Sequence, residues 1–174
     1  MCDANDFDDP SYNGNLCYDP DHSCGDTQEI PDDDHKQNVK ITFGSGYLKG
    51  YFVKDRVTIG DPDPHHSPSS RLVLDDYTFG MVTEETAFHN TFDAIIGMAY
   101  PEFAEPGVVP LFDAMMDSHI LSMNVFAFHM SMNPDDEDSE VMFGDWNLAK
   151  IDDSWNGDGT LDWHPVKHFL FWSI

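Results

Sequence analysis

The sequence predicts an all-β domain, made mostly of strands with one or two short helices. Short apolar or alternating segments recur along residues 39–174, turns rich in glycine and proline separate them, and only one convincing segment has helical spacing. With 40% hydrophobic and 13% aromatic residues in a chain of 174, there is enough apolar surface for a folded core. These observations exclude a chain that is disordered throughout.

Acidic residues dominate the charge balance, with 33 Asp and Glu against 8 Lys and Arg and a net charge of -25. A field of this sign repels phosphate backbones and anionic membrane surfaces, so we expect no nucleic-acid partner. The acidity fits either a solvated surface or adaptation to an acidic compartment. No apolar run reaches the roughly 18 residues of a membrane span, and the N-terminal residues do not resemble a signal peptide.

Residues 1–38 are rich in Asp, Asn, Pro and Gly, which predicts a loop region. The three cysteines of the chain, Cys2, Cys17 and Cys24, all fall in this region. Their polar surroundings favour loops held by a disulfide over buried thiols. An odd number leaves one cysteine unpaired, from which we expect that the chain is a piece of a longer protein.

Residues 39–60 alternate apolar, aromatic and β-branched residues around a Gly-Ser-Gly centre. This pattern predicts a β-hairpin, with the glycines at its tip, followed by a third strand. Residues 61–70 then predict a polar loop, and residues 71–85 resume the composition of a strand.

The rest of the chain predicts one helix among further strands. Residues 92–101 form a short apolar run closed by proline, which favours a buried strand over a helix. Residues 109–120 have apolar side chains near helical spacing and a proline close to the start. The predicted apolar face of this helix consists of Val109, Phe112, Met115, Met116 and Ile120. The strands predicted after it lie within residues 125–130, 140–147, 160–166 and 168–174, the second of them running into a turn, with an acidic loop at 133–140.

Two segments of the first half, taken together, resemble the pepsin-like aspartic endopeptidases. Residues 41–46, ITFGSG, followed by Asp55 and residues 57–60, are similar to the flap hairpin of that family and the strand behind it. Residues 92–116, FDAIIGMAYPEFAEPGVVPLFDAMM, are similar to the family segment with the Phe-Asp-Gly-Ile-Leu-Gly-Leu core and the following helix. Residues 18–23, YDPDHS, match the family more loosely.

A third segment supports the same resemblance. Residues 139–151, followed by residues 159–166 and 171–174, are similar to the glycine-turn strand of the family and to its paired Trp-Val-Pro-Val and Tyr-Trp-Gln-Ile strands. The order and approximate spacing of the three segments agree with the family. An unrelated β domain would have no reason to contain these three segments in the same order.

The resemblance implies a pepsin-like acid protease fold that is incomplete in this chain. Residues 1–38 would be a cysteine-containing loop region of the N-terminal lobe, residues 39–158 the remainder of that lobe, and residues 159–174 the first strands of the C-terminal lobe. It also implies a monomeric aspartic endopeptidase that takes peptide or protein substrates and uses no metal or organic cofactor. Such an enzyme would be secreted or housed in an acidic compartment such as a lysosome or vacuole.

Hydrolysis in this family requires two aspartates, each in an Asp-Thr-Gly or Asp-Ser-Gly loop, which share a proton and hold the attacking water. Neither triplet occurs in the 174 residues. From the resemblance we expect the first loop to lie before Met1 and the second after Ile174. The chain would then lack both catalytic aspartates and be inactive alone.

The resemblance assigns substrate binding to the predicted hairpin. Glycines at its tip allow positive φ angles and close approach of the backbone to an extended peptide, so Gly44 and Ser45 are candidate contacts. Phe43 stands where the family usually has a tyrosine, so the ring is kept while the hydroxyl that anchors the flap is lost.

Five further residues receive roles from the resemblance. Phe92 and Ile95, with Phe88, match positions that line the pocket for the residue before the scissile bond, although aromatic residues of a β domain also serve as ordinary core. Ile96 and Gly97 match an element that supports the first catalytic loop.

Three alternatives stay open at this point. One is a catalytically dead homologue, which keeps the flap and the pockets and binds peptides without hydrolysing them. An acidic calcium-binding module is suggested by Asp9, Ser11, Asn13 and Gly14, although Pro20 stands where a bidentate glutamate is needed. A zinc site could be formed by Cys17, His22, Cys24 and His35, but their spacing fits no compact zinc-binding motif.

Overall fold

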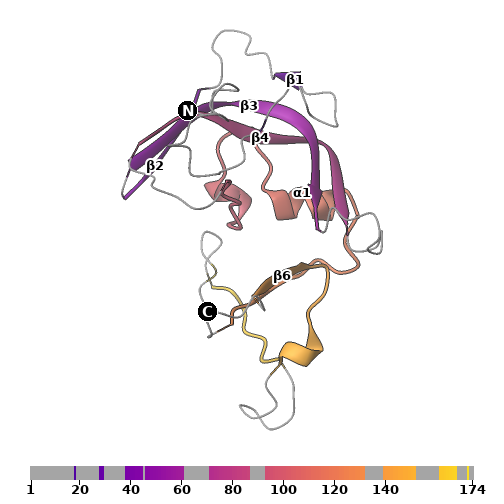
Figure 1. The fold of residues 1–174 in the computed structure, drawn as a ribbon. Coiled ribbons are helices and arrows are strands. Elements are labelled where there is room, and N and C mark those ends of the chain that lie inside the picture. The colour runs from indigo at the N-terminus through magenta and orange to yellow at the C-terminus, as the bar shows by residue number, and fades with distance from the viewer. Residues whose placement is uncertain are drawn as a thin grey trace, which may run out of the picture. The chain divides into compact units, whose positions relative to one another are not determined.

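The structure is a computed structural model, in which mostly strands are seen (Figure 1). The residues that it describes are 18, 28–29, 38–44, 46–60, 71–86, 93–131, 139–151, 161–167 and 172. Among them there is one α-helix, α1, together with two short 3-10 helices. The predicted all-β class is therefore confirmed. The chain divides into two compact units, Met1–Ala114 and Met115–Ile174.

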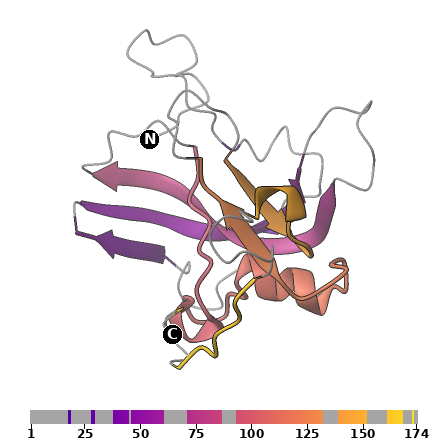
Figure 2. The ribbon, with the colours of Figure 1, turned by 90° about the horizontal axis from the view of Figure 1, so that it is seen from below.

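A four-stranded antiparallel sheet organises the first unit. Its strands are β1 (Gln28–Glu29), β2 (Asn38–Phe43), β3 (Gly46–Ile59) and β4 (Leu72–Thr86). β3 is central, because β2 and β1 pair with successive parts of one edge while β4 pairs along the other. Figure 2 shows β2, β3 and β4 side by side.

The hairpin predicted within residues 39–60 is confirmed, but the separate third strand is wrong, because β3 continues without a break to Ile59. The ladder between β3 and β4 shifts register between Lys49 and Gly50. A Cβ added at Gly50 would lie 1.9 Å from the carbonyl oxygen of Met81. Gly50 thus permits close contact between two strands and marks no turn.

The prediction of loop throughout residues 1–38 is also wrong at β1, where Gln28 and Glu29 pair with Lys54 and Val53. Two paired residues are too few to give a periodic pattern in the sequence. Apart from Tyr18 and Asn38, the rest of the region, including all three cysteines, lies outside the described residues.

The apolar core of the first unit joins the sheet to the start of α1 (Leu111–Asp117). Its buried members are Val39, Val53, Leu74, Leu111 and Phe112. The Tyr77 hydroxyl donates a hydrogen bond of 3.1 Å to the carbonyl oxygen of Val109, which ties β4 to the segment before the helix. Burial, and then the nearby Asp113 carboxylate, raise the pKa of Tyr77 above its ordinary value.

The helix predicted at residues 109–120 is confirmed in a shorter form, and its buried face differs from the predicted one. Leu111, Phe112 and Met115 are buried, whereas Val109 precedes the helix and is exposed. Pro110 also lies before the helix, and its carbonyl accepts the Ala114 amide at 2.9 Å. The start of the helix is thus later than the apolar spacing alone indicates.

The end of α1 is closed by two backbone hydrogen bonds typical of a Schellman motif. The His119 amide donates to the Met116 carbonyl at 3.0 Å, and the Ile120 amide donates to the Met115 carbonyl at 3.4 Å. His119 occupies the left-handed position with φ of 54°. A residue with a Cβ is strained there, since this conformation favours glycine.

Replacing His119 with glycine is expected to stabilise the chain by about 1 kcal/mol, because the left-handed conformation costs a residue with a Cβ roughly 1–2 kcal/mol. Part of this gain in stability is offset, because glycine increases the conformational entropy of the unfolded chain. Urea unfolding followed by circular dichroism measures the change. The matched control is His119→Ala, which keeps the strain and should show no gain; equal midpoints for the two variants would contradict the expectation.

The second unit contains a two-stranded antiparallel sheet of β5 (Phe126–His129) and β6 (Glu140–Phe143). Both strands lie within predicted ones, whereas their pairing was not predicted. The turn after β6 uses Gly144 with φ of 81°, and its amide donates to the Val125 carbonyl at 2.8 Å. The hydroxyl of Ser122 donates to the Gly144 carbonyl. These bonds join the turn to the residues before β5.

Aromatic side chains cluster around this small sheet. Phe126 makes edge-to-face contacts with Phe128 and Trp172, with ring centroids 5.8 and 5.3 Å apart, and Trp146 contacts Trp163 at 5.8 Å. The strand predicted at residues 160–166 is wrong, because residues 161–167 have no regular structure. Apolar and polar residues alternate there, but alternation forms a strand only where a partner strand is available.

The remaining short elements are η4 (Pro101–Phe103) and η5 (Leu148–Lys150). The side-chain oxygen of Asn147 accepts the Ala149 amide at 3.0 Å, which caps η5. Within the described ranges, no helix combines the length and apolar character needed to cross a membrane.

Candidate functional site

The tip of the β2–β3 hairpin is open. Phe43 and Gly46 form the last pair of the ladder, and Gly44 lies in the turn between them. An added Cβ at Gly44 would meet no atom within 4 Å. Gly44 does not use the positive φ that glycine allows, which among described glycines is found at Gly60, Gly107 and Gly144. Gly44 therefore contributes free space next to the backbone, without unusual dihedral angles.

The segment predicted as a buried strand, residues 92–101, is not a strand in its described part. Residues 93–100 have no regular structure, and Ile95 and Ile96 are 50% and 56% exposed. At Gly97 an added Cβ would again meet no atom within 4 Å. An apolar run of this length forms a strand only when a neighbouring strand completes its hydrogen bonds, and the described residues provide none.

The predicted site residues are thus only partly placed. Phe43 and Gly44 lie at the hairpin tip, and residues 95–97 lie on the irregular segment, within the same compact unit. Ser45, Phe88 and Phe92 lie outside the described residues. The substrate-binding and support roles of these residues remain predictions.

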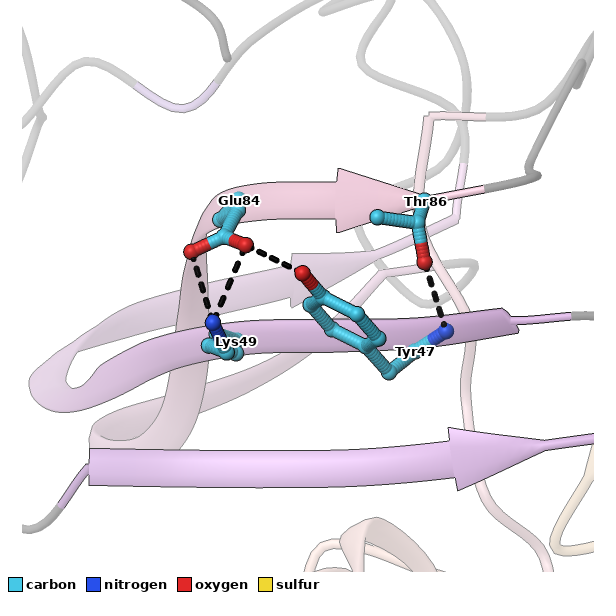
Figure 3. Close-up of polar contacts among 4 residues, drawn as sticks. All are labelled: Tyr47, Lys49, Glu84 and Thr86. Carbon is cyan, nitrogen blue, oxygen red and sulfur yellow. Dashed lines mark hydrogen bonds and ion pairs between the residues drawn. The ribbon is translucent and has the colours of Figure 1, made fainter.

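A polar cluster beside the hairpin tip was not predicted. We call Tyr47, Lys49 and Glu84 the clasp; Figure 3 shows that it joins β3 to β4. The Lys49 ammonium lies 2.9 and 3.0 Å from the two carboxylate oxygens of Glu84, and the Tyr47 hydroxyl donates to the same carboxylate. The Tyr47 amide donates to the Thr86 hydroxyl at 3.2 Å.

The electrostatics of the clasp favour its charged form. Hydrogen bonds, first from Tyr47 and then from Lys49, hold the pKa of Glu84 below its ordinary value. The hydrogen bond to Glu84 raises the pKa of Lys49. Two ammonium groups, of Lys40 and Lys49, lie 4.9 and 4.7 Å from the centre of the Tyr47 ring, within cation–π range.

Further ion pairs follow the same arrangement along the sheet. Lys54 lies 3.8 Å from Asp76, and Arg56 lies 2.5 Å from Asp75. In every described ion pair, β3 therefore supplies the cation and β4 supplies the carboxylate. The signal in the sequence is the presence of basic residues on one strand and acidic residues on the next, but their pairing depends on the register.

No group of three or more potential metal ligands is found within the described ranges. The residues considered for calcium, Asp9, Ser11, Asn13 and Gly14, lie outside those ranges. So do the residues considered for zinc, which are Cys17, His22, Cys24 and His35.

The sequence matches the eukaryotic aspartyl protease family over residues 9–174. It is 32% identical over 140 residues to cathepsin E from Cavia porcellus, an alignment that covers 79% of this chain and 32% of that protein. It is 35% identical over 139 residues to pregnancy-associated glycoprotein 1 from Bos taurus, with coverage of 79% and 32%. It is 35% identical over 137 residues to cathepsin D from Clupea harengus, with coverage of 77% and 31%. The chain thus spans about a third of the length of these curated relatives.

Proposed function

Because the chain belongs to the eukaryotic aspartyl protease family, we propose that it supplies one wall of the peptide-binding cleft of an aspartic endopeptidase. The observation that supports this most is the β2–β3 hairpin, which has an open tip at Gly44 and a sequence that resembles the family's flap. A hairpin tip of this kind can offer backbone groups for strand-like hydrogen bonds with an extended peptide. Phe43, half-buried beside the tip, would contribute its ring to the same wall.

Hydrolysis in this family needs two catalytic aspartates, each in an Asp-Thr-Gly or Asp-Ser-Gly loop. In the proposed reaction one aspartate takes a proton from a water molecule while the second, protonated, polarises the scissile carbonyl. Neither Asp-Thr-Gly nor Asp-Ser-Gly occurs in the sequence. We therefore propose that the 174-residue polypeptide binds peptide through the hairpin but does not cleave it.

The finer assignments are part of the same proposal. Ser45 would join Gly44 at the tip, and Ile95, with Phe88 and Phe92, would line the pocket for the side chain before the scissile bond. Ile96 and Gly97 would support a catalytic loop. The net charge of -25 fits a protein that works in an acidic compartment or outside the cell, where many carboxylates are protonated.

We expect the purified 174-residue polypeptide to show no turnover of a fluorogenic peptide with bulky apolar residues around the scissile bond, at any acidic pH. The same peptide should slow hydrogen–deuterium exchange at the amides of residues 39–49. The variant Gly44→Ala is the matched test, because the added methyl meets no atom of the chain but occupies the space that a peptide backbone would use.

Two results would overturn the proposal. Turnover by the polypeptide alone would show that it contains its own catalytic groups. Equal protection of residues 39–49 in the wild type and in Gly44→Ala, or no protection in either, would show that the hairpin tip does not bind the peptide.

Sequencing the transcript on both sides of the region that encodes these 174 residues separates a protease from a dead homologue. In-frame Asp-Thr-Gly or Asp-Ser-Gly codons there would support the protease.

A further inference from the structure

The hairpin is backed by a third strand almost to its tip. The tip pair is Phe43 with Gly46, and the next residue of β3, Tyr47, already pairs with Thr42 of β2 and Thr86 of β4. Few hairpin residues therefore extend beyond the sheet. Tyr47 and Lys49, which follow the tip directly, contact Glu84 and Thr86 at the end of β4.

We propose that Glu84 is a positioning residue for the peptide-binding hairpin, and that protonation of its carboxylate loosens the hairpin from β4. The first part rests on the proposed function, since it concerns the same hairpin. The second part concerns the clasp alone and is measured without peptide.

The contacts of Glu84 make it the centre of the clasp. Its carboxylate accepts the Tyr47 hydroxyl and both contacts of the Lys49 ammonium, so one group of β4 holds two side chains of β3. The hydrogen bond from the Tyr47 amide to the Thr86 hydroxyl links the same strands through a group that does not titrate. The contacts of Glu84 should therefore depend on pH, whereas the hydrogen bond to Thr86 should not.

The charges around Glu84 explain why its protonation matters. Lys40 from β2 and Lys49 from β3 face each other as a cross-strand pair, and both ammonium groups lie near the Tyr47 ring, while that of Lys49 also contacts the Glu84 carboxylate directly. On β4, the neighbour Glu85 pairs with Leu48 and belongs to the opposite face of the sheet. If Glu84 were neutral, the ammonium groups of Lys40 and Lys49 would lie directly opposite each other without its compensating charge. This arrangement destabilises the pairing of β2 with β3.

The direction of the pH effect follows from the lowered pKa of Glu84. A carboxylate with a lowered pKa in the folded state stabilises that state above its ordinary pKa. This stabilisation is lost as the pH falls through the lowered value. The hairpin should accordingly be firm at neutral pH and loosen only at a pH below that at which an ordinary glutamate is protonated.

The experiment is hydrogen–deuterium exchange of the full 174-residue chain across acidic to neutral pH, corrected for the intrinsic pH dependence of exchange. The wild type should lose protection at residues 39–49 by about two- to fivefold as the pH falls, in line with a solvent-exposed ion pair. In Glu84→Gln, residues 39–49 should have at every pH the low protection that the wild type has in acid. The step, which is the loss of protection as the pH falls, should therefore be absent. Glu85→Gln is the matched control, because it removes one charge from the opposite face and should keep the step.

The outcomes separate the two parts of the proposal. A wild-type pH step that persists in Glu84→Gln, or that disappears in Glu85→Gln, would overturn the role of Glu84 in the clasp. Thr86→Val should reduce protection equally at every pH and leave the step in place.

If Glu84→Gln removes the step but the variant binds the fluorogenic peptide as well as the wild type at neutral pH, the positioning role is overturned. If the peptide protects neither protein, the proposed function fails, whereas the step without peptide still reports on the clasp.

Discussion

Replacing Gly50 with alanine is expected to lower the free energy of unfolding by about 3 kcal/mol, at the upper end of what overpacking costs. The new Cβ would lie 1.9 Å from the Met81 carbonyl oxygen and 2.8 Å from its carbon. Both are backbone atoms within the β3–β4 ladder, so relief requires the two long strands to separate. Urea unfolding of the chain, followed by tryptophan fluorescence and circular dichroism, measures the loss.

Gly80→Ala provides the matched control, since Gly80 lies on β4, where the nearest atom to an added Cβ is a side-chain carbon of Phe52 at 3.9 Å. This is ordinary van der Waals contact, and the reduced freedom of the unfolded chain should make the variant neutral or slightly more stable. Similar unfolding midpoints for the two variants would show that β4 does not approach Gly50 as closely as the structure has it.

Replacing Asp55 with alanine should cost about 2–3 kcal/mol, because hydrogen bonds to charged groups contribute roughly 1.5–3 kcal/mol each. Asp55 is 2% exposed and accepts hydrogen bonds from the Tyr18 hydroxyl and, at 2.6 Å, from the Arg56 amide. The ladder shifts register between Asp55 and Val57, and the carboxylate supplies an acceptor for the backbone at this irregularity. Thermal unfolding of the variant measures the effect.

A double-mutant cycle with Tyr18→Phe isolates the contribution of the hydroxyl. Tyr18 also packs edge-to-face on Phe79, with ring centroids 5.1 Å apart, and the phenylalanine variant preserves that contact. Asp55→Asn keeps an acceptor oxygen and should lose less stability than Asp55→Ala. Additive effects of Tyr18→Phe and Asp55→Ala would show that the hydroxyl and the carboxylate do not interact.

Much of the first unit could be predicted from local patterns. Alternation on both sides of Gly-Ser-Gly predicted the hairpin, and residues 71–85 predicted β4 to within one residue at each end. The pattern failed where the outcome depends on a partner strand. Residues 92–101 and 160–166 have the composition of strands, but their described parts form no ladder.

The clasp could not be predicted because its members meet only through the register of two strands. Counting outward from the pair Lys49 and Glu84 would place Asp55 opposite Thr78, whereas the structure pairs Asp55 with Tyr77. Each bulge adds such a shift, and nothing in the period of either strand indicates it. The family resemblance identified the hairpin but gave no reason to single out Glu84.

The outer edge of β4 affects how the chain behaves in solution. In the described part of the chain this edge pairs with no strand, and β4 carries four exposed acids, Asp75, Asp76, Glu84 and Glu85. If two molecules aligned these edges, like charges would be brought together, which discourages sheet-to-sheet growth between copies. Acid neutralises the carboxylates and removes this safeguard, so the isolated chain should be most prone to aggregate at low pH.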